Sequence, residues 1–266
     1  MKRVIFALLH SGGSYMLSRN FRLQRVGDID WVLRNYEIRR VSLGVDELMV
    51  IDVSRGERDR DGEERFHRDV ERLVQECFIP VTVGGHLRSI DQVARCFAVG
   101  ADKVLLRTAF TKDPKLCEEV AARYGSQAMI AGIDLTRQRS ADVAEVGPLV
   151  LIEELSAHLR RVIGCGAGEV LLQSVDNDGT GMGLDLSVVL EVGSPEAPVI
   201  LMGGVGHAAH IVEGLMLPEV DAVATANLFN FVGDALVEAR TVARAAGITL
   251  ARWSEADIER MRDVLR

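Results

Sequence analysis

The feature that most constrains this chain is an alternation of short apolar runs with amphipathic segments that continues along its whole length. Two amphipathic segments, residues 63–78 and 113–125, have the spacing of apolar residues that favours a helix. Eight strand–helix units, with no linker or composition shift between them, predict one domain over residues 1–266: a (β/α)8 barrel, or TIM barrel. The expected strands cover residues 4–9, 47–52, 80–83, 103–107, 128–133, 169–174, 198–202 and 221–225.

Internal repeats support a barrel built from two similar halves. PVTVGG (80–85) returns as PVILMGG (198–204), and DKVLLRTAF (102–110) returns as DAVATANLF (221–229). The copies lie about half the chain apart, as duplication of a half-barrel predicts, whereas solenoid repeats are shorter and more numerous. Residues 254–266 begin with a capping box, so we expect an extra C-terminal helix there.

Composition narrows the functional class. Hydrophobic residues make up 48% of the chain, which suits a packed core, and the net charge of −8 argues against a nucleic-acid surface. The first apolar run is too short to span a membrane and lacks a signal-peptide cleavage site, so we expect no membrane contact. Four cysteines without CxxC spacing predict reduced thiols in a cytoplasmic protein: Cys77, Cys96, Cys117 and Cys165.

Paired glycines follow two expected strands at corresponding places in the two halves. Gly84-Gly85 ends the third strand and Gly203-Gly204 the seventh, at the barrel edge where chemistry is found. Backbone amides without a Cβ in the way can bind phosphate, so the pairs predict two phosphate sites; tight turns without a ligand are the alternative. Two polar residues end neighbouring strands and would donate hydrogen bonds beside these glycines: Thr108 and Asn227.

The stretch SVDNDGTGMG (174–183) closes the sixth strand with two carboxylates. Asp178 and Gly179 are typical of a ligand-binding loop, and a capping loop without a ligand is the alternative. The glycine position and the missing distal glutamate do not fit a calcium loop. Three histidines follow strands at the same edge without HxH or HExxH pairing, so we expect no metal and no cofactor: His10, His86 and His207.

Charged residues begin four strands with the same parity, so alternation places them together inside the N-terminal end of the barrel. These residues are Arg3, Glu47, Lys103 and Glu169. Two cations and two anions can neutralise each other in a closed ring, and the alternative is a solvated fringe at the barrel end. The same alternation points Leu9 inward at the opposite end of the first strand.

Several stretches together resemble the cyclase subunit of imidazole glycerol phosphate synthase over nearly the whole chain. They are GVDELMVID, GADKV, YGSQAMIAGID, GAGEVLLQSVDNDG and GGVG. In that family a glutaminase docks at the N-terminal end of the barrel, and ammonia crosses the barrel to a substrate with two phosphates. The resemblance therefore implies that the four charged residues form an ammonia gate and that Asp102 and Gln127 lie near the partner interface. It also implies phosphate- and ligand-binding positions at Gly84, Gly85, Thr108, Asp178, Gly179, Gly203, Gly204 and Asn227.

The resemblance implies two catalytic aspartates, at the ends of the first and fifth strands. Asp134 matches the second, whereas Leu9 occupies the first and cannot exchange a proton, so paired-carboxylate chemistry for ring closure is incomplete. The chain departs from the family pattern at four more positions. They are Leu17 for the lysine of a loop, His86 for a third glycine, Arg107 for an asparagine and Asn227 for a serine.

A chain that keeps the four gate residues but has Leu9 in place of a catalytic aspartate is similar to divergent paralogues associated with glycosyl amidation. This implies an ammonia-accepting synthase subunit of a glutamine amidotransferase complex, which converts an acetamido to an acetamidino group on a phosphorylated or nucleotide-linked sugar in surface-polysaccharide synthesis. The expected partners are a glutaminase subunit, an ATP-dependent amide-activating enzyme and a phosphorylated small molecule. The alternatives are a working cyclase of histidine synthesis, using Asp134 alone or with His10, a sister isomerase, and a non-catalytic barrel that activates the glutaminase.

Overall fold

The structure is a computed structural model in which part of the chain is described. The expected helix over 254–266 falls largely outside the described residues, and Asn227 lies outside them. Within the described part, no helix is long and apolar enough to cross a membrane. The described residues are 1–266 except 20–21, 37, 39–43, 57–58, 138–147, 194, 227–234, 253, 255, 257–259 and 261–266.

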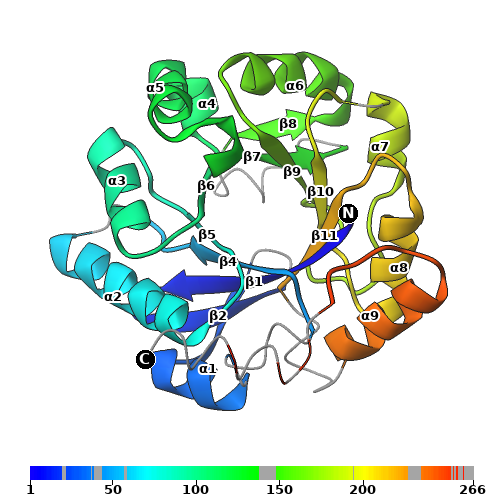
Figure 1. Ribbon diagram of the computed structural model, residues 1–266. Helices are drawn as coiled ribbons and strands as arrows, with labels where there is room; N and C mark the ends of the chain where they lie inside the picture. Colours follow the sequence, from blue (N-terminus) through cyan, green and yellow to red (C-terminus); the bar gives the residue numbers. More distant parts are fainter. Residues whose placement is uncertain are drawn as a thin grey trace.

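Eight parallel strands close into a barrel with helices around its outside (Figure 1). The strand order is β1-β4-β5-β6-β7-β9-β10-β11, and β11 pairs with β1 to close the sheet. This confirms the predicted (β/α)8 barrel, and each barrel strand overlaps one of the eight expected runs. Their bounds are β1 Arg3–Ser11, β4 Glu47–Asp52, β5 Val81–Gly84, β6 Lys103–Leu106, β7 Met129–Thr136, β9 Glu169–Ser174, β10 Val199–Met202 and β11 Ala222–Thr225.

Helices follow the strands, and several begin at side chains that cap their first turn. The carboxylate of Asp59 accepts from the Gly62 amide at the start of α2, and the hydroxyl of Ser89 accepts from the Gln92 amide at the start of α3. The helices are α2 Arg60–Glu76, α3 Ile90–Ala98, α4 Ala109–Lys112, α5 Pro114–Tyr124, α6 Leu155–Gly164, α7 Ser187–Val192, α8 Ala208–Met216 and α9 Ala235–Ala245. Short 3-10 turns cover Ser126–Ala128 and Ile152–Glu154.

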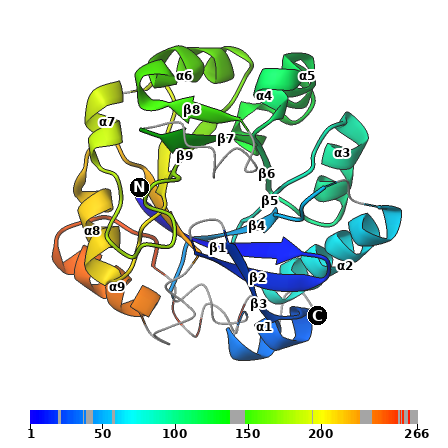
Figure 2. The same ribbon diagram turned by 180° about the vertical axis from the view of Figure 1, so that it is seen from behind.

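Among the described residues, three strands lie outside this regular alternation. Strands β2 (Ser14–Arg19) and β3 (Arg22–Gly27) form an antiparallel hairpin that extends the sheet from β1, and helix α1 (Ile29–Asn35) lies beside them (Figure 2). The short strand β8 (Leu149–Leu151) pairs with the end of β7. The hairpin was not predicted because β3 is exposed or half-buried along its length and shows no run of apolar residues.

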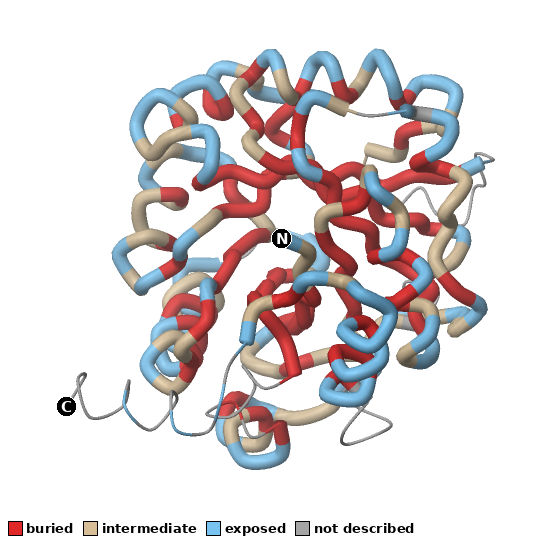
Figure 3. The backbone as a smooth tube through the Cα atoms, turned by 45° about the vertical axis from the view of Figure 1, so that its right-hand side comes forward, coloured by how far each residue is buried: buried red, intermediate tan, exposed pale blue. Residues whose placement is uncertain are grey.

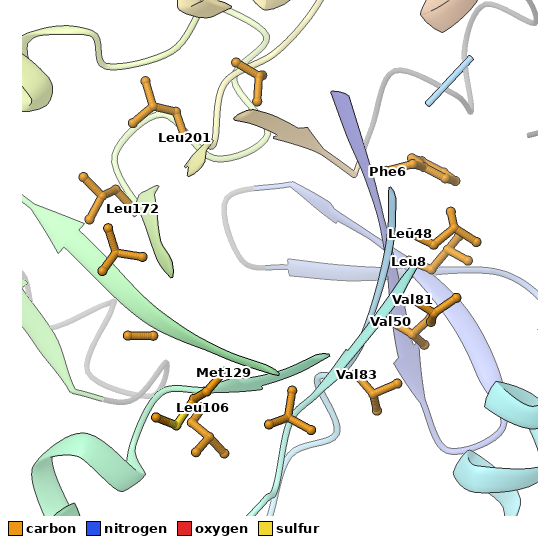
Figure 4. Close-up of a cluster of buried hydrophobic side chains, with 14 of the residues drawn as sticks. Phe6, Leu8, Leu48, Val50, Val81, Val83, Leu106, Met129, Leu172 and Leu201 are labelled. Atoms are coloured by element: carbon orange, nitrogen blue, oxygen red, sulfur yellow. The ribbon is translucent and has the colours of Figure 1, made fainter. Parts of the chain in front are cut away.

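Alternation along the barrel strands produces two separate apolar cores. Outward-facing side chains pack between the barrel and the helices, and Figure 4 shows Phe6, Leu8 and Val50 among them. Because both faces are covered, the strands are buried while the outer faces of the helices remain exposed (Figure 3). Inward-facing side chains form the second core: Ile5, Ala7, Leu9, Met49, Ile51, Leu105, Ile130, Leu171, Ile200, Met202, Ala222 and Ala224.

The two halves of the barrel repeat their local geometry as well as their sequence. The carboxylate of Asp102 accepts from the Val81 amide at 2.8 Å, and Asp221 accepts from the Val199 amide at 3.0 Å. At the opposite end, a Cβ on Gly85 would lie 2.1 Å from the backbone oxygen of Asp52. In the second half Gly203 stands in the same relation to Ser174, which agrees with a half-barrel repeat.

Replacing Gly85 with alanine is expected to cost about 3 kcal/mol, because the new Cβ meets the backbone and φ is +94°. Gly247 also has positive φ, +84°, but a Cβ there meets nothing within 4 Å. Gly247→Ala should therefore cost only about 1 kcal/mol. Urea unfolding of both variants measures the difference, and equal losses would show that the close approach at Gly85 carries no penalty.

Candidate functional site

The N-terminal end of the barrel holds a closed ring of charged side chains. Arg3 donates from Nη1 to Glu47 Oε1 and from Nη2 to Glu169 Oε2, at 2.6 Å each. Lys103 Nζ lies 2.6 Å from Glu169 Oε1 and 3.3 Å from Glu47 Oε1. Cations and anions alternate around the ring, and each side chain is less than one-fifth exposed. The four residues therefore form the charged ring rather than a solvated fringe.

The ring changes the titration of its members. Burial would raise the pKa of the Glu169 carboxyl, but hydrogen bonds and charge from Arg3 and Lys103 outweigh burial and hold that pKa below its usual value. Burial likewise opposes the charged form of Arg3, and its bonds to the two glutamates raise the pKa of its guanidinium. Both shifts favour the charged forms of Arg3 and Glu169.

Asp102 and Gln127 lie at the same end of the barrel as the ring. Asp102 immediately precedes β6, and Gln127 lies in the 3-10 turn just before β7. Both residues are exposed, and the Asp102 carboxylate also holds the start of β5 through Val81. Asp46 likewise holds the start of β1 by accepting from the Val4 amide, but it is buried against Arg240 at 2.6 Å. On this rim, Asp102 and Gln127 are therefore exposed for contact with another protein, whereas Asp46 is not.

At the opposite end, Asp134 on β7 is fully buried and faces into the barrel. Arg107, just after β6, donates from Nη1 to Asp134 Oδ2 at 2.5 Å and from Nη2 to Gln173 Oε1 on β9 at 3.2 Å. Arg107 can lie across β7 because Gly132 has no side chain, and a Cβ there would lie 3.3 Å from Arg107 Nε. We call the C-terminal end of the barrel the mouth, and we call Arg107, Asp134 and Gln173 the mouth triad.

Burial raises the pKa of Asp134 above its ordinary value. The Arg107 charge and its hydrogen bond act against this rise, while the nearby charge of Asp178 adds to it. Asp134 is therefore a buried carboxyl whose surroundings favour its protonated form more than water does.

Replacing Arg107 with methionine should raise the pKa of Asp134 further, because the neighbouring cation and its hydrogen bond are lost. The measurement is a pH titration of the aspartate carboxyl ¹³C resonances, with Asp134→Asn to assign the signal. Arg72→Gln, which removes an exposed arginine from Asp30, is the matched control. An unchanged Asp134 titration in Arg107→Met would mean that the ion pair does not control this carboxyl.

Leu9 lies across the barrel from Asp134, since β1 and β7 are four strands apart in the closed order. It is buried in the inward apolar core and supplies no proton-transfer group. The hairpin reaches over the same end, because Ser18 on β2 donates to Asp178 Oδ2 at 2.7 Å. Because successive side chains of a strand point to opposite faces, Leu17 points away from the face of β2 that carries Ser18.

The predicted phosphate loops lie at this end of the barrel, but close packing against neighbouring residues already accounts for their glycines. Gly85 and Gly203 meet backbone oxygens, a Cβ on Gly84 would lie 2.7 Å from Leu105 Cβ, and one on Gly204 would lie 2.0 Å from Gly183 oxygen. Gly179 also has positive φ, 68°, which favours a glycine. Thr108 is exposed at the start of α4, and its side chain makes no capping hydrogen bond to that helix. The geometry permits anion binding here and does not require it.

The histidines do not converge. His10 is buried on the outer face of β1, where Nε2 lies 3.2 Å from Asp69 Oδ2 on α2, so it cannot replace the carboxylate missing at Leu9. His86 has φ of 57°, and its Nε2 lies 2.8 Å from the Ser54 oxygen. His207 lies against His210 with ring centroids 3.6 Å apart and the rings tilted by 35°. Among the described residues, no group of three or more metal-ligating side chains could hold an ion.

Strand parity predicts the ring, and the family resemblance points to Asp134, but neither predicts how the mouth is assembled. Alternation from Lys103 and Glu169 places Arg107 and Gln173 on inward faces, yet nothing in the sequence indicates that both meet Asp134. Gly132 on the strand between them was the available signal, because a glycine inside a strand often marks a close approach. The contact of Ser18 with Asp178 depends on the hairpin and had no sequence signal.

Comparison with known proteins agrees with this geometry. Residues 27–233 match a family model described as histidine biosynthesis protein. The chain is also 41% identical over 259 residues to "Putative imidazole glycerol phosphate synthase subunit hisF2" of Parasynechococcus marenigrum (strain WH8102), covering 95% of this chain and 94% of that protein. The resemblance to the cyclase subunit is thereby confirmed, and the chain belongs to the histidine biosynthesis protein family.

Proposed function

We propose that this chain is the ammonia-accepting synthase subunit of a glutamine amidotransferase complex and that it aminates the acetamido group of a phosphorylated or nucleotide-linked sugar for surface polysaccharide. The contrast between the two barrel ends carries the proposal. The charged ring of Arg3, Glu47, Lys103 and Glu169 is complete. At the mouth, Leu9 supplies no carboxylate, and Asp134 is paired with Arg107.

In this proposal the ring is the gate for ammonia made by a glutaminase partner. The partner docks on the rim that carries Asp102 and Gln127, and ammonia enters when the ring opens. Beyond the ring, ammonia meets the apolar inward core, including Ile5, Met49 and Leu171. Because that core offers no counterion, it favours passage of neutral ammonia over ammonium.

At the mouth, the proposed substrate is held by its phosphates at the glycine loops Gly84-Gly85 and Gly203-Gly204, with Thr108, Asp178 and Gly179 beside them. An ATP-dependent partner activates the amide oxygen, and ammonia replaces that oxygen on the amide carbon. Asp134 is the acid–base residue that removes a proton from the attacking nitrogen. Four buried thiols suit a reducing compartment, and we place the complex in the cytoplasm.

Ring closure in histidine synthesis is the second candidate, and the name of the hisF2 relative favours it. That chemistry calls for acid–base groups on both sides of the substrate. Across the barrel from Asp134 this chain has Leu9, and His10 faces α2 instead of the mouth. These observations support amidation over ring closure.

The test is isotope transfer by the complex that copurifies with the tagged chain. Glutamine labelled with ¹⁵N in its side-chain amide is supplied with ATP and N-acetylated nucleotide sugars, and, separately, with the substrate of imidazole glycerol phosphate synthase. We expect ¹⁵N in an acetamidino sugar, detected by mass spectrometry. Label in the imidazole product instead would overturn the proposal in favour of ring closure.

A further inference from the structure

The mouth triad contains a buried hydrogen-bond acceptor with no partner. Asp134 is 0% exposed, and its Oδ1 makes no hydrogen bond with any described residue, whereas Oδ2 is held by Arg107. An unsatisfied buried carboxylate oxygen is costly unless a ligand supplies a donor. Oδ1 therefore points to a ligand that carries an N–H or O–H group.

Arg107 stands beside this acceptor with donors to spare. A guanidinium has five N–H groups, and the structure shows two hydrogen bonds from Arg107 to described residues, to Asp134 and Gln173. Those two bonds fix the plane of the guanidinium, and its side chain is 24% exposed. The remaining N–H groups can donate to an oxygen that enters the mouth.

The opposite charges of Arg107 and Asp134 determine which kind of ligand group can bind between them. Arg107 and Asp134 offset each other, so the pair favours neither a bare anion nor a bare cation. It presents a donor and an acceptor side by side, which complements a nitrogen and an oxygen on one carbon atom. The inward core of the barrel, which includes Leu9, Ile51 and Met202, is apolar and suits a small alkyl substituent on that carbon.

We infer that Arg107 is a further catalytic residue and that, with Asp134, it clamps the N–C–O unit formed when ammonia adds to an amide carbon. Asp134 Oδ1 accepts an N–H of the ammonia nitrogen, and Arg107 donates to the oxygen on the same carbon. This deepens the proposed function and rests on it, because it names the reacting group: a carboxamide already activated on oxygen by an ATP-dependent enzyme.

The step balances within these groups. The ammonia lone pair forms the new C–N bond while the π bond between the amide carbon and the sugar nitrogen opens onto that nitrogen, and a proton passes from the ammonia nitrogen to Asp134 Oδ1. The lone pair of the sugar nitrogen then re-forms the π bond and the C–O bond breaks, so that the activated oxygen leaves with the bonding pair while Arg107 donates to it. Asp134 afterwards releases its proton to the leaving group or to water.

The test uses the wild-type chain and two small probes, acetamide and N,N-dimethylacetamide. Acetamide presents N–H and oxygen on one edge, whereas N,N-dimethylacetamide has the oxygen but no N–H. Binding is followed by backbone ¹H–¹⁵N shifts of Gly132 and Gln173. We expect acetamide to bind about tenfold more tightly, a difference of about 1.4 kcal/mol. We also expect saturation below about 200 mM, as a few well-placed atoms allow.

Substitutions of Arg107 and Asp134 show whether acetamide binds at these two residues. Arg107→Met should weaken acetamide binding about tenfold, and Asp134→Asn should remove the preference between probes, since an amide side chain both donates and accepts. Arg72→Gln should change neither, and unchanged shifts away from the mouth show that the variants fold. Equal affinities, no saturable binding, or full binding in Arg107→Met would overturn the inference. No glutaminase, ATP or sugar is used, so failure here leaves the isotope-transfer result intact.

Discussion

Replacing Glu169 with glutamine is expected to lower the free energy of unfolding by about 3 kcal/mol, because breaking one side of a buried ion network leaves charges uncompensated. Glu169 contacts Arg3 and Lys103 at 2.6 Å each. Without its charge, two cations at the end of the barrel share Glu47 alone. Urea unfolding at neutral pH measures the loss.

The pH dependence of stability distinguishes the loss of the Glu169 charge from a simple packing defect. The pKa of Glu169 is lowered in the folded chain, so its stabilisation is present above the unfolded value of about 4.3 and is lost as the pH falls through the lower folded value. The gap between wild type and Glu169→Gln should therefore shrink in acid. Glu191→Gln, which removes a half-exposed partner of Arg137, is the control and should cost less than about 0.5 kcal/mol. A gap that stays constant with pH would contradict the ring as its cause.

Replacing Lys103 with methionine should uncouple the two sources of nitrogen in the amidation reaction. Lys103 bridges Glu47 and Glu169, and its loss leaves a carboxylate-rich opening where the ring was closed. We expect glutamine-dependent product to fall about tenfold or more, equivalent to about 1.4 kcal/mol in the barrier to transfer. Product formed from ammonium salt, which can reach the mouth without crossing the ring, should fall much less.

The comparison uses the copurified complex with ¹⁵N-glutamine in one reaction and ¹⁵N-ammonium chloride in the other. Both reactions share the same mouth, so the ammonium reaction reports any general damage to the fold. Lys112→Met, at the end of α4 and away from the ring, is the matched lysine control. Equal losses with both nitrogen sources would mean that Lys103 supports the barrel without gating it.

The barrel and its ring were predictable because each depends on a periodic pattern. Strands buried on both faces read as continuous apolar runs, and these runs recur eight times. Once a strand is located, parity alone decides which side chains face inward. Arg3, Glu47, Lys103 and Glu169 share both parity and position at strand starts, so closure of the barrel had to bring them together.

The mouth was less predictable because its contacts cross several strands and loops. Arg107 reaches over Gly132 to Asp134, and that path depends on strand stagger rather than on local sequence. Ser18 meets Asp178 through a polar hairpin that shows no apolar alternation. His10 was expected at the mouth from its place after a strand, yet β1 extends to Ser11 and turns His10 outward against Asp69.

The most direct test of the account is ring closure itself. The purified chain is given the substrate of imidazole glycerol phosphate synthase, with ammonium salt as nitrogen source, and formation of the imidazole product is measured beside the same reaction with Asp134→Asn. Because Leu9 leaves the mouth without its second carboxylate and Arg107 holds the first, we predict no turnover above the Asp134→Asn background, although the protein is folded. Turnover at the rate of an authentic cyclase, abolished by Asp134→Asn, would contradict the account and assign the chain to histidine synthesis.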